Sequence, residues 1–231
     1  MPKKYIWLKD VIFPKSETQS KTKKSNTINN EKPQQFWAWF TEHLEPLTMM
    51  SDLPEAQQTE LLDQLQAQLT AYCDGLTYEI SDPTPNGRTL TLSAEGDIEL
   101  FPQLVALTDA APDFDWWEIV PFKQPRGVDL RVIFDQYTFE TAHMKFQQLE
   151  NDIEPDILGL RIALPNPSRD DEDQLVGVYV TLEALLGEFD CATLVGYLET
   201  CPLPANDDSS FQPLDDLPEF VEWFKKQRDK E

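Results

Sequence analysis

The chain has 231 residues, of which 40% are apolar and 11% aromatic, enough to build a packed core. Its 42 acidic and 19 basic side chains give a formal net charge of −23, and a field of this sign repels nucleic acid and attracts basic proteins. The 3 cysteines form no CxxC pair, which argues against a secreted disulfide framework. The composition therefore predicts an acidic cytoplasmic protein that does not bind nucleic acid.

The first 32 residues differ from the rest, because they carry a charge of +5 while the remainder carries −28. Residues 14–33 are polar and almost free of apolar side chains, which predicts a flexible linker. The preceding stretch YIWLKDVIF (5–13) is apolar enough to dock as a strand or a short helix on this protein or a neighbour. Lys9 and Asp10 interrupt it, so we expect neither a signal peptide nor a transmembrane segment.

Helical spacing of apolar residues predicts a first helix over 34–47 and a second that begins near Pro54 and stops at Gly75. Strand patterns follow at 77–81 and 88–96, joined by a turn that contains Asn-Gly. A helix is expected over 101–111.

Four strand-like runs come next, at 116–122, 129–135, 139–146 and 157–165. In the third, alternation predicts Ala142, Met144 and Phe146 on one face. A helix is expected from the acidic run 169–173 to Gly187, then a strand over 191–199 and a last helix from Asp216.

This order predicts an α+β fold with a largely antiparallel sheet of about six to seven strands and helices packed mainly on one side. We expect a basic segment and linker over 1–33, one α+β domain over 34–201, and a linker with a C-terminal helix over 202–231 that packs on the domain.

Motifs of the common enzyme classes are missing, including GxGxxG, the Walker loop, HExxH, GxSxG and the EF-hand loop. We therefore assign no catalytic residue and expect no cofactor. Glu95, Asp97 and Glu99 form a weak metal candidate, because three carboxylates share one face if the segment is extended.

Paired tryptophans suggest a binding surface. Trp-x-Trp and Trp-Trp pairs direct at least one ring outward on a regular element, and exposed tryptophan beside carboxylates suits contact with a basic protein. The alternative is that both faces of these elements are packed. The contact candidates are Trp37, Trp39, Trp116, Trp117, Asp113 and Asp115.

Four segments together resemble an uncharacterised family of bacterial proteins, a domain of unknown function. They are FWAWF (36–40), AEGDIELFPQLVALTDAAP (94–112), WWEIVPFKQP (116–125) and GVYVTLEALLGEFD (177–190), and the likeness covers roughly residues 34–200. The resemblance implies a bacterial cytosolic origin and no activity. Family members often carry a further C-terminal domain, which we expect this chain to lack.

The resulting interpretation is a non-enzymatic, acidic protein-binding module that engages a basic partner. One form is an immunity-type protein that neutralises a bacterial toxin. Two alternatives stay open: an enzyme or a metal- or ligand-binding protein with a carboxylate site, and an accessory domain tethered by its lysine-rich tail to a membrane or another protein. The sequence does not indicate the oligomeric state.

Overall fold

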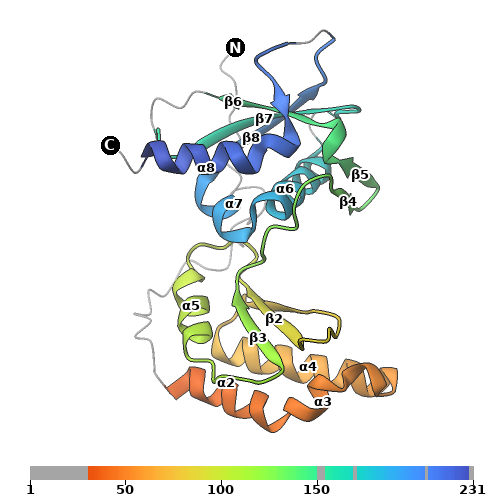
Figure 1. The fold of residues 1–231 in the computed structure, drawn as a ribbon, viewed down its shortest axis with the longest axis vertical. Coiled ribbons are helices and arrows are strands. Elements are labelled where there is room, and N and C mark those ends of the chain that lie inside the picture. The colour runs from red at the N-terminus through yellow and green to blue at the C-terminus, as the bar shows by residue number, and fades with distance from the viewer. Residues whose placement is uncertain (1–30, 150–153, 169–170, 206–207, 229–231) are drawn as a thin grey trace. The chain divides into compact units, whose positions relative to one another are not determined.

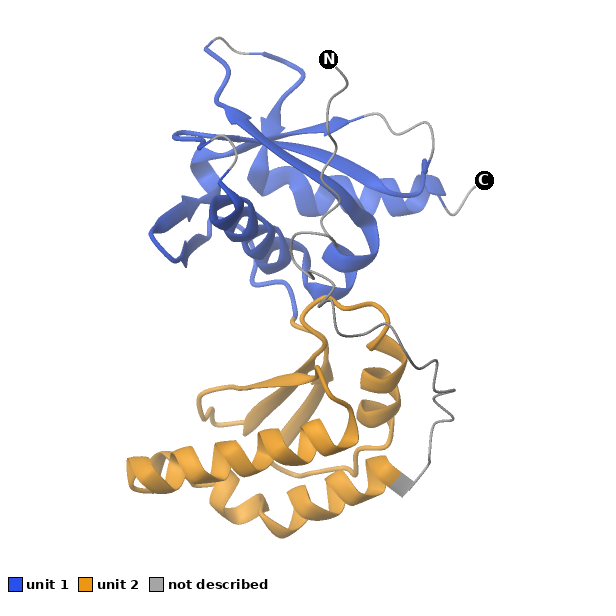
Figure 2. Ribbon diagram, turned by 180° about the vertical axis from the view of Figure 1, so that it is seen from behind, with its two compact units in different colours: residues 1–21, 124–231 blue, residues 22–123 orange. Residues whose placement is uncertain are grey.

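The computed structural model describes residues 31–149, 154–168, 171–205 and 208–228 (Figure 1). The expected docking segment 5–13 and most of the linker 14–33 lie outside these residues. The chain divides into two compact units, with the boundary between Lys123 and Gln124 (Figure 2). Among the described residues, unit 2 is the earlier part of the chain and unit 1 the later part. The boundary between the two units falls inside residues 34–201, for which a single domain is expected from the sequence.

Unit 2 contains the helices α2 (Glu31–Glu42), α3 (Leu44–Thr48), η1 (Met50–Asp52), α4 (Glu55–Tyr72) and α5 (Phe101–Asp109). The single helix expected over 34–47 is divided at His43. Pro46 explains the break, because its ring would clash with the carbonyl of Glu42 in a continuous helix. The second helix is confirmed, with Leu61, Leu65 and Leu69 buried along one stripe.

The sheet of unit 2 has the order β1-β2-β3, with β1 (Thr77–Ile80), β2 (Arg88–Ser93) and β3 (Trp117–Pro121). Strands β1 and β2 are antiparallel, whereas β2 and β3 are parallel. The parallel pair needs a crossover, which α5 supplies. Leu90 and Leu92 are buried together, as the alternation predicts.

Unit 1 begins with the hairpin β4 (Arg131–Phe134) and β5 (Tyr137–Glu140), which pair only with each other. A second sheet has the order β8-β7-β6-β9. The remaining elements are η2 (Thr141–His143), β6 (Lys145–Leu149), β7 (Leu158–Leu164), α6 (Glu172–Leu186), α7 (Glu188–Leu194), β8 (Val195–Pro202), β9 (Gln212–Pro213), η3 (Leu214–Asp216) and α8 (Leu217–Arg228).

Two strand predictions in unit 1 are wrong in their limits. The run 139–146 is divided between β5 and β6, which belong to different sheets, because the 3-10 turn η2 interrupts the alternation. Met144 and Phe146 are buried, but Ala142 is exposed. The strand expected over 191–199 begins only at Val195, since Cys191 and Leu194 are buried at helical spacing on α7.

The mixed helix-and-strand class is confirmed, and the single sheet of six to seven strands is wrong. The described residues form sheets of three, two and four strands. Pairing between strands depends on contacts far apart in the chain, which local alternation does not specify. Among the described helices, none is long and apolar enough to span a membrane.

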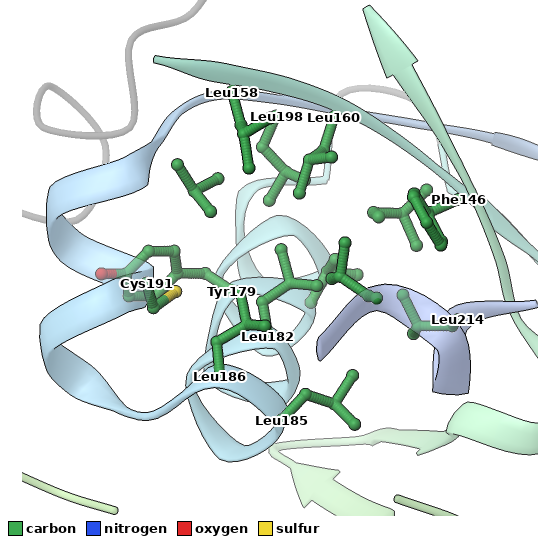
Figure 3. Packing of buried hydrophobic residues seen from close by; sticks show 14 of the residues in the cluster. Phe146, Leu158, Leu160, Tyr179, Leu182, Leu185, Leu186, Cys191, Leu198 and Leu214 are labelled. Carbon is green, nitrogen blue, oxygen red and sulfur yellow. The ribbon is translucent and has the colours of Figure 1, made fainter. Parts of the chain in front are cut away.

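The core of unit 1 lies between the four-stranded sheet and the helices α6, α7 and α8, which cover the same face of the sheet (Figure 1). Leu158 and Leu160 of β7 face Leu182 and Leu185 of α6 (Figure 3). The C-terminal helix takes part in this core through Leu217, Val221 and Phe224.

Candidate functional site

Trp37 and Trp117 belong to the core of unit 2. Trp37 is 2% exposed and its Nε1 donates to the Leu107 carbonyl at 2.8 Å. Trp117 is 6% exposed and its Nε1 donates to Thr48 Oγ1 at 2.8 Å. These bonds satisfy both indole N–H groups inside the protein. In this structure neither ring forms part of the exposed surface that the tryptophan pattern suggested.

The other two tryptophans are more accessible. The Trp39 ring is half-buried and stacks on His43, with centroids 4.2 Å apart. Trp116 is 57% exposed. Within the Trp-Trp pair one ring therefore points inward and the other outward, as expected for adjacent residues at the start of a strand.

The segment Asp113–Glu118, here called the Trp116 loop, is held firmly at its backbone. The Trp116 carbonyl accepts a hydrogen bond from the Arg88 N–H at 2.9 Å. Phe114 and Trp117 form an isolated bridge, and the Phe114 ring packs on Phe40 with centroids 5.4 Å apart. The exposed indole of Trp116 is thus presented from a braced turn.

The turn before β2 also braces the Trp116 loop. Gly87 has φ +114, and a Cβ built on it would lie 2.3 Å from the Trp116 carbonyl oxygen. Only glycine permits this close approach of two backbones at a positive φ. The Asn-Gly signal in the sequence therefore marks a residue that positions the loop.

Three acidic residues flank Trp116 in the chain: Asp113, Asp115 and Glu118. All three are exposed. Within the described part of the chain, none of their side chains takes part in an ion pair or a hydrogen bond. The loop therefore combines one exposed aromatic ring with three formal negative charges that form no ion pair with any described residue.

Unit 2 as a whole has little positive charge to offset its acidic residues. Residues 31–123 contain three basic side chains, Lys32, Arg88 and Lys123. Arg88 is 5% exposed, and Lys123 pairs with Glu95 at 2.6 Å. The acidic residues of this range are Glu31, Glu42, Glu45, Asp52, Glu55, Glu60, Asp63, Asp74, Glu79, Asp82, Glu95, Asp97, Glu99, Asp109, Asp113, Asp115 and Glu118.

The weak metal candidate does not have the geometry expected of it. Strand β2 ends at Ser93, and Glu95 has φ +51, so the segment is a turn rather than an extended strand. Asp97 Oδ1 accepts the Glu99 N–H at 3.0 Å. Among the described residues, no group of three or more His, Cys, Asp or Glu side chains is arranged to hold a metal ion.

The Glu95 side chain accepts hydrogen bonds from neighbouring polar side chains and does not belong to a metal site in the described residues. Its carboxylate accepts from Lys123 Nζ at 2.6 Å and from Thr77 Oγ1 at 2.5 Å. Burial raises its pKa, but the hydrogen bonds from Lys123, Thr77 and Ser93 outweigh burial and hold the pKa of Glu95 below its ordinary value. The carboxylate links the ends of three segments of unit 2.

Unit 1 has a cleft of about 470 Å³ that the sequence did not indicate. It lies between the β5–η2 segment and the chain that leaves β7 toward α6. Its lining is Gln136, Tyr137, Thr138, Phe139, Glu140, His143, Met144, Leu164, Pro165, Asn166 and Gln174. The volume is in the range of small-molecule pockets.

Two polar side chains of the cleft lining, Gln174 and Tyr137, are hydrogen-bonded to residues on the chain that leads into α6. Gln174 is buried; its amide donates to the Asn166 carbonyl at 3.1 Å, and its oxygen accepts the Ser168 N–H at 2.7 Å. The Tyr137 hydroxyl donates to Asp171, which also caps α6 by accepting the Gln174 N–H at 3.1 Å. The tyrosine bond raises the pKa of Tyr137 and lowers the pKa of Asp171.

Histidine and cysteine supply no nucleophile pair in unit 1. His143 is exposed and its Nδ1 lies 3.0 Å from Glu140 Oε2. Cys191 is fully buried in the core, and burial raises the pKa of its thiol. A buried thiol with a raised pKa is inert.

Comparisons with family models, with curated proteins and with solved structures found no match. The family resemblance drawn from the four segments therefore stays a prediction. The physical arrangement of the residues carries the functional argument.

Proposed function

We propose that this protein is a non-enzymatic binding module, and that the Trp116 loop of unit 2 is its contact with a basic protein. The single observation that carries the proposal is the exposed Trp116 ring on a braced turn beside the uncompensated Asp113, Asp115 and Glu118. Binding hot spots are enriched in tryptophan, and surrounding charge steers the encounter of opposite surfaces.

The charge of unit 2 favours a basic partner over a nucleic acid or an anionic membrane. Residues 31–123 contain only three basic side chains, one of them buried, so this part of unit 2 offers no basic patch that would neutralise phosphate groups. One form of such a partner is a basic toxin, such as a nuclease, that the protein neutralises in a bacterial cytoplasm. A surface toxin-binding role would need no cofactor.

One experiment tests separately whether binding depends on charge and whether it depends on the Trp116 ring. The tagged chain would be used for affinity purification from its host at low and at high salt, with mass spectrometry of the bound proteins. A basic partner should bind at low salt and dissociate at high salt. Affinity of the purified partner should then fall by about tenfold or more in Trp116→Ala.

Matched charge variants test whether the association rate depends on where the carboxylates lie on unit 2. The triple variant D113N/D115N/E118Q should lower the association rate several-fold at low salt. The control E42Q/E55Q/D63N removes the same three charges from exposed positions on other parts of unit 2 and should change the rate much less. If both triple variants lowered the association rate equally, the rate would depend only on the net charge of unit 2, and the Trp116 loop would not be a specific binding site.

The cleft of unit 1 supports a second candidate, a small-ligand-binding role. It combines a lining of mixed polarity with a volume of about 470 Å³. A thermal-shift screen of metabolites and metals would test it. A hit should be lost in Thr138→Trp, which places a large ring at an exposed lining position, and kept in Thr59→Trp on α4.

A further inference from the structure

One edge of the β4–β5 hairpin lies in the cleft of unit 1. Every residue of β5 (Tyr137–Glu140) lines the cleft, whereas none of the described residues of β4 (Arg131–Phe134) does. Successive side chains of a strand point to opposite faces. A cavity that contacts four consecutive residues therefore lies along the edge of the strand and not over one face. The cleft follows the edge of β5 that is turned away from β4.

The opposite side of the cleft is formed by the end of β7 and the first turn of α6. Leu164 is the last residue of β7, and Pro165 and Asn166 follow it along the lining. The buried part of the lining is mainly apolar, because Phe139, Met144 and Leu164 are exposed by 4% or less. The cleft therefore has a strand edge on one side and an apolar interior.

The register of the hairpin determines which backbone groups of β5 point into the cleft. Phe134 and Tyr137 flank a two-residue turn, in which Asp135 has φ +49. Such a closing pair exchanges both of its N–H···O bonds, and hydrogen-bonded pairs then alternate along the ladder. The Thr141 N–H donates to the Leu130 carbonyl at 3.0 Å, which is the same phase of alternation.

Thr138 and Glu140 fall between the hydrogen-bonded pairs of this ladder. Their N–H and C=O groups point away from β4, and no described residue is hydrogen-bonded to any of these four groups. Donors and acceptors two residues apart, at a spacing of about 7 Å, match the backbone of another extended chain. A peptide that adds as a strand is held mainly by bonds of this kind.

The β5 edge has few of the features that normally prevent strand addition. Edge strands are commonly protected by Lys, Pro or a bulge. The sequence of β5 contains neither Lys nor Pro, and its register with β4 is regular. We propose that the cleft binds an extended peptide segment of another protein, which adds to β5 as a third, antiparallel strand of the hairpin.

The side chains around the edge indicate the chemistry of the peptide. Residues opposite each other in an antiparallel pair have their side chains on the same face. The peptide residue opposite Phe139 therefore points into the buried part of the cleft and should be apolar. The residue opposite Glu140 lies beside this carboxylate and should be Arg or Lys. Because the two chains are antiparallel, the order in the peptide is a basic residue, an apolar residue and then the residue opposite Thr138.

The charge of the cleft agrees with a basic residue at this position. Glu140 is the only lining residue with a formal charge when His143 is neutral. It is 48% exposed and lies 3.0 Å from His143 Nδ1 and 3.7 Å from Arg131 Nε, both on exposed side chains. Exposed pairs of this kind are weak, so a peptide cation can replace them.

This proposal assigns a peptide to the cleft for which a small-ligand role is the second candidate function. It does not depend on the Trp116 loop. Trp116→Ala should bind the peptide as the original chain does, so failure of one proposal leaves the other intact.

The probe is the synthetic peptide acetyl-Gly-Thr-Arg-Val-Thr-Gly-amide. Its Arg, Val and second Thr would lie opposite Glu140, Phe139 and Thr138. The peptide is titrated into the isotope-labelled full chain and followed by NMR. The amide signals of Thr138 and Glu140 should shift and reach saturation, since their N–H groups gain acceptors.

N-methylated peptides test the backbone contacts with the protein unchanged. A methyl group on the nitrogen of Arg or of the second Thr removes a donor that faces β5 and should weaken binding by about tenfold or more. The matched control carries the methyl group on the nitrogen of Val, which faces away from β5, and should change the affinity by less than about threefold.

Protein variants test the same edge from the other side. Thr138→Pro removes the N–H that points into the cleft and should abolish binding. Ile133→Pro, at the opposite edge of the hairpin, is its control. Glu140→Lys should weaken the Arg peptide by about fivefold and favour a peptide with Glu in place of Arg. If Thr138→Pro does not fold, as judged by circular dichroism, the N-methylated peptides and Glu140→Lys decide the question.

Three results would overturn the proposal. The first is the absence of a saturable shift at Thr138 and Glu140. The second is an equal loss of affinity from all the N-methylated peptides. The third is a shift of these signals with protein concentration in the absence of peptide, which would assign the edge to a second copy of the chain.

Discussion

The buried side chain of Arg88 connects three segments of unit 2 through hydrogen bonds. Its guanidinium donates from Nε to the Thr48 carbonyl at 3.1 Å, from Nη1 to the Ser81 carbonyl at 3.1 Å and from Nη2 to Ser51 Oγ at 2.7 Å. All three acceptors are neutral, so its role is to join the α3–η1 segment and the β1–β2 connection to β2. Arginine suits this role because its donors point in fixed directions.

Replacement of Arg88 by alanine should therefore lower the free energy of unfolding by about 2 to 3 kcal/mol, since three acceptors lose their donor. Chemical denaturation followed by circular dichroism would measure the change. Arg131→Ala is the control: its side chain is exposed and lies 3.7 Å from Glu140, so the change should stay within about 0.5 kcal/mol. Equal losses in the two variants would contradict the organising role.

The lowered pKa of Glu95 predicts how the stability of the protein depends on pH in the acidic range. Its pKa is lower in the folded protein than its ordinary value of 4.5, so the unfolded chain binds more protons as the pH falls through this range. The stabilisation is present above pH 4.5 and is lost as the pH falls below it toward the folded pKa. Because the side chain is 49% exposed, the contribution should be less than about 1 kcal/mol.

The measurement is the denaturation midpoint at a series of pH values between about 6 and 3. Glu95→Gln should be less stable than the original chain at pH 6, and the difference should shrink as the pH falls. Glu99→Gln, at an exposed carboxylate, should show no such convergence. A difference for Glu95→Gln that is constant over the whole range would show that the ion pair contributes nothing.

At the scale of elements, turns decide how the strands present their side chains. Gly87 and Gly127 both have a strongly positive φ, of +114 and +97, but only Gly87 is crowded. A Cβ on Gly87 would meet the Trp116 backbone, while nothing lies within 4 Å of a Cβ on Gly127. The two positions therefore separate backbone strain from displacement of the Trp116 loop.

Gly127→Ala should cost about 1 kcal/mol from strain alone, and Gly87→Ala should cost clearly more because the Trp116 loop has to move. Thermal unfolding of both variants measures the difference. Gly87→Ala should also shift the tryptophan fluorescence, whereas Gly127→Ala should not. Similar stabilities for both would mean that the loop adapts freely and is not braced by this turn.

The ends of helices were predicted correctly from the sequence where a glycine marks them. α4 ends at Tyr72, and Gly75 follows three residues later with φ +94, while Gly187 lies between α6 and α7 with φ +80. The break at His43 and the start of β8 at Val195 were missed. Pro46 was the signal for the first break, and the helical spacing of Cys191 and Leu194 was the signal for the late start of β8, but the apolar residues on either side of each boundary concealed both.

At the scale of the whole molecule, the two units each bury an apolar core. In unit 2 it includes Phe36, Phe40, Leu65, Leu90 and Leu104, each 2% exposed or less. A unit with its own core is able to fold alone. We expect a fragment of residues 31–123 to unfold cooperatively on heating, with a circular dichroism spectrum of mixed helix and strand.

That fragment should also retain an exposed Trp116, which acrylamide quenching of fluorescence would detect, and Trp116→Ala is the matched control for this signal. A fragment that lacks a cooperative transition would show that unit 2 depends on the rest of the chain. The prediction concerns the described residues of unit 2 and requires no assumption about how the units are arranged.

The sequence by itself determined the mixed helix-and-strand class, most of the elements, the acidic character and the inward alternation of β2. These properties depend on local spacing and on composition, which are present in any stretch of the chain. The FWAWF motif illustrates the limit: helical spacing placed Phe36 and Phe40 correctly, but it left both possibilities open for Trp37.

Only the tertiary structure decided that the described strands form three sheets, that Trp37 and Trp117 are buried while Trp116 is exposed, and that the segment with Glu95, Asp97 and Glu99 is not an extended strand. It also revealed the cleft of unit 1. Each of these depends on partners distant in the sequence, such as Trp37 with Leu107 or Arg161 with Glu199. Burial and pairing are properties of the contacts made between segments, and no local pattern contains them.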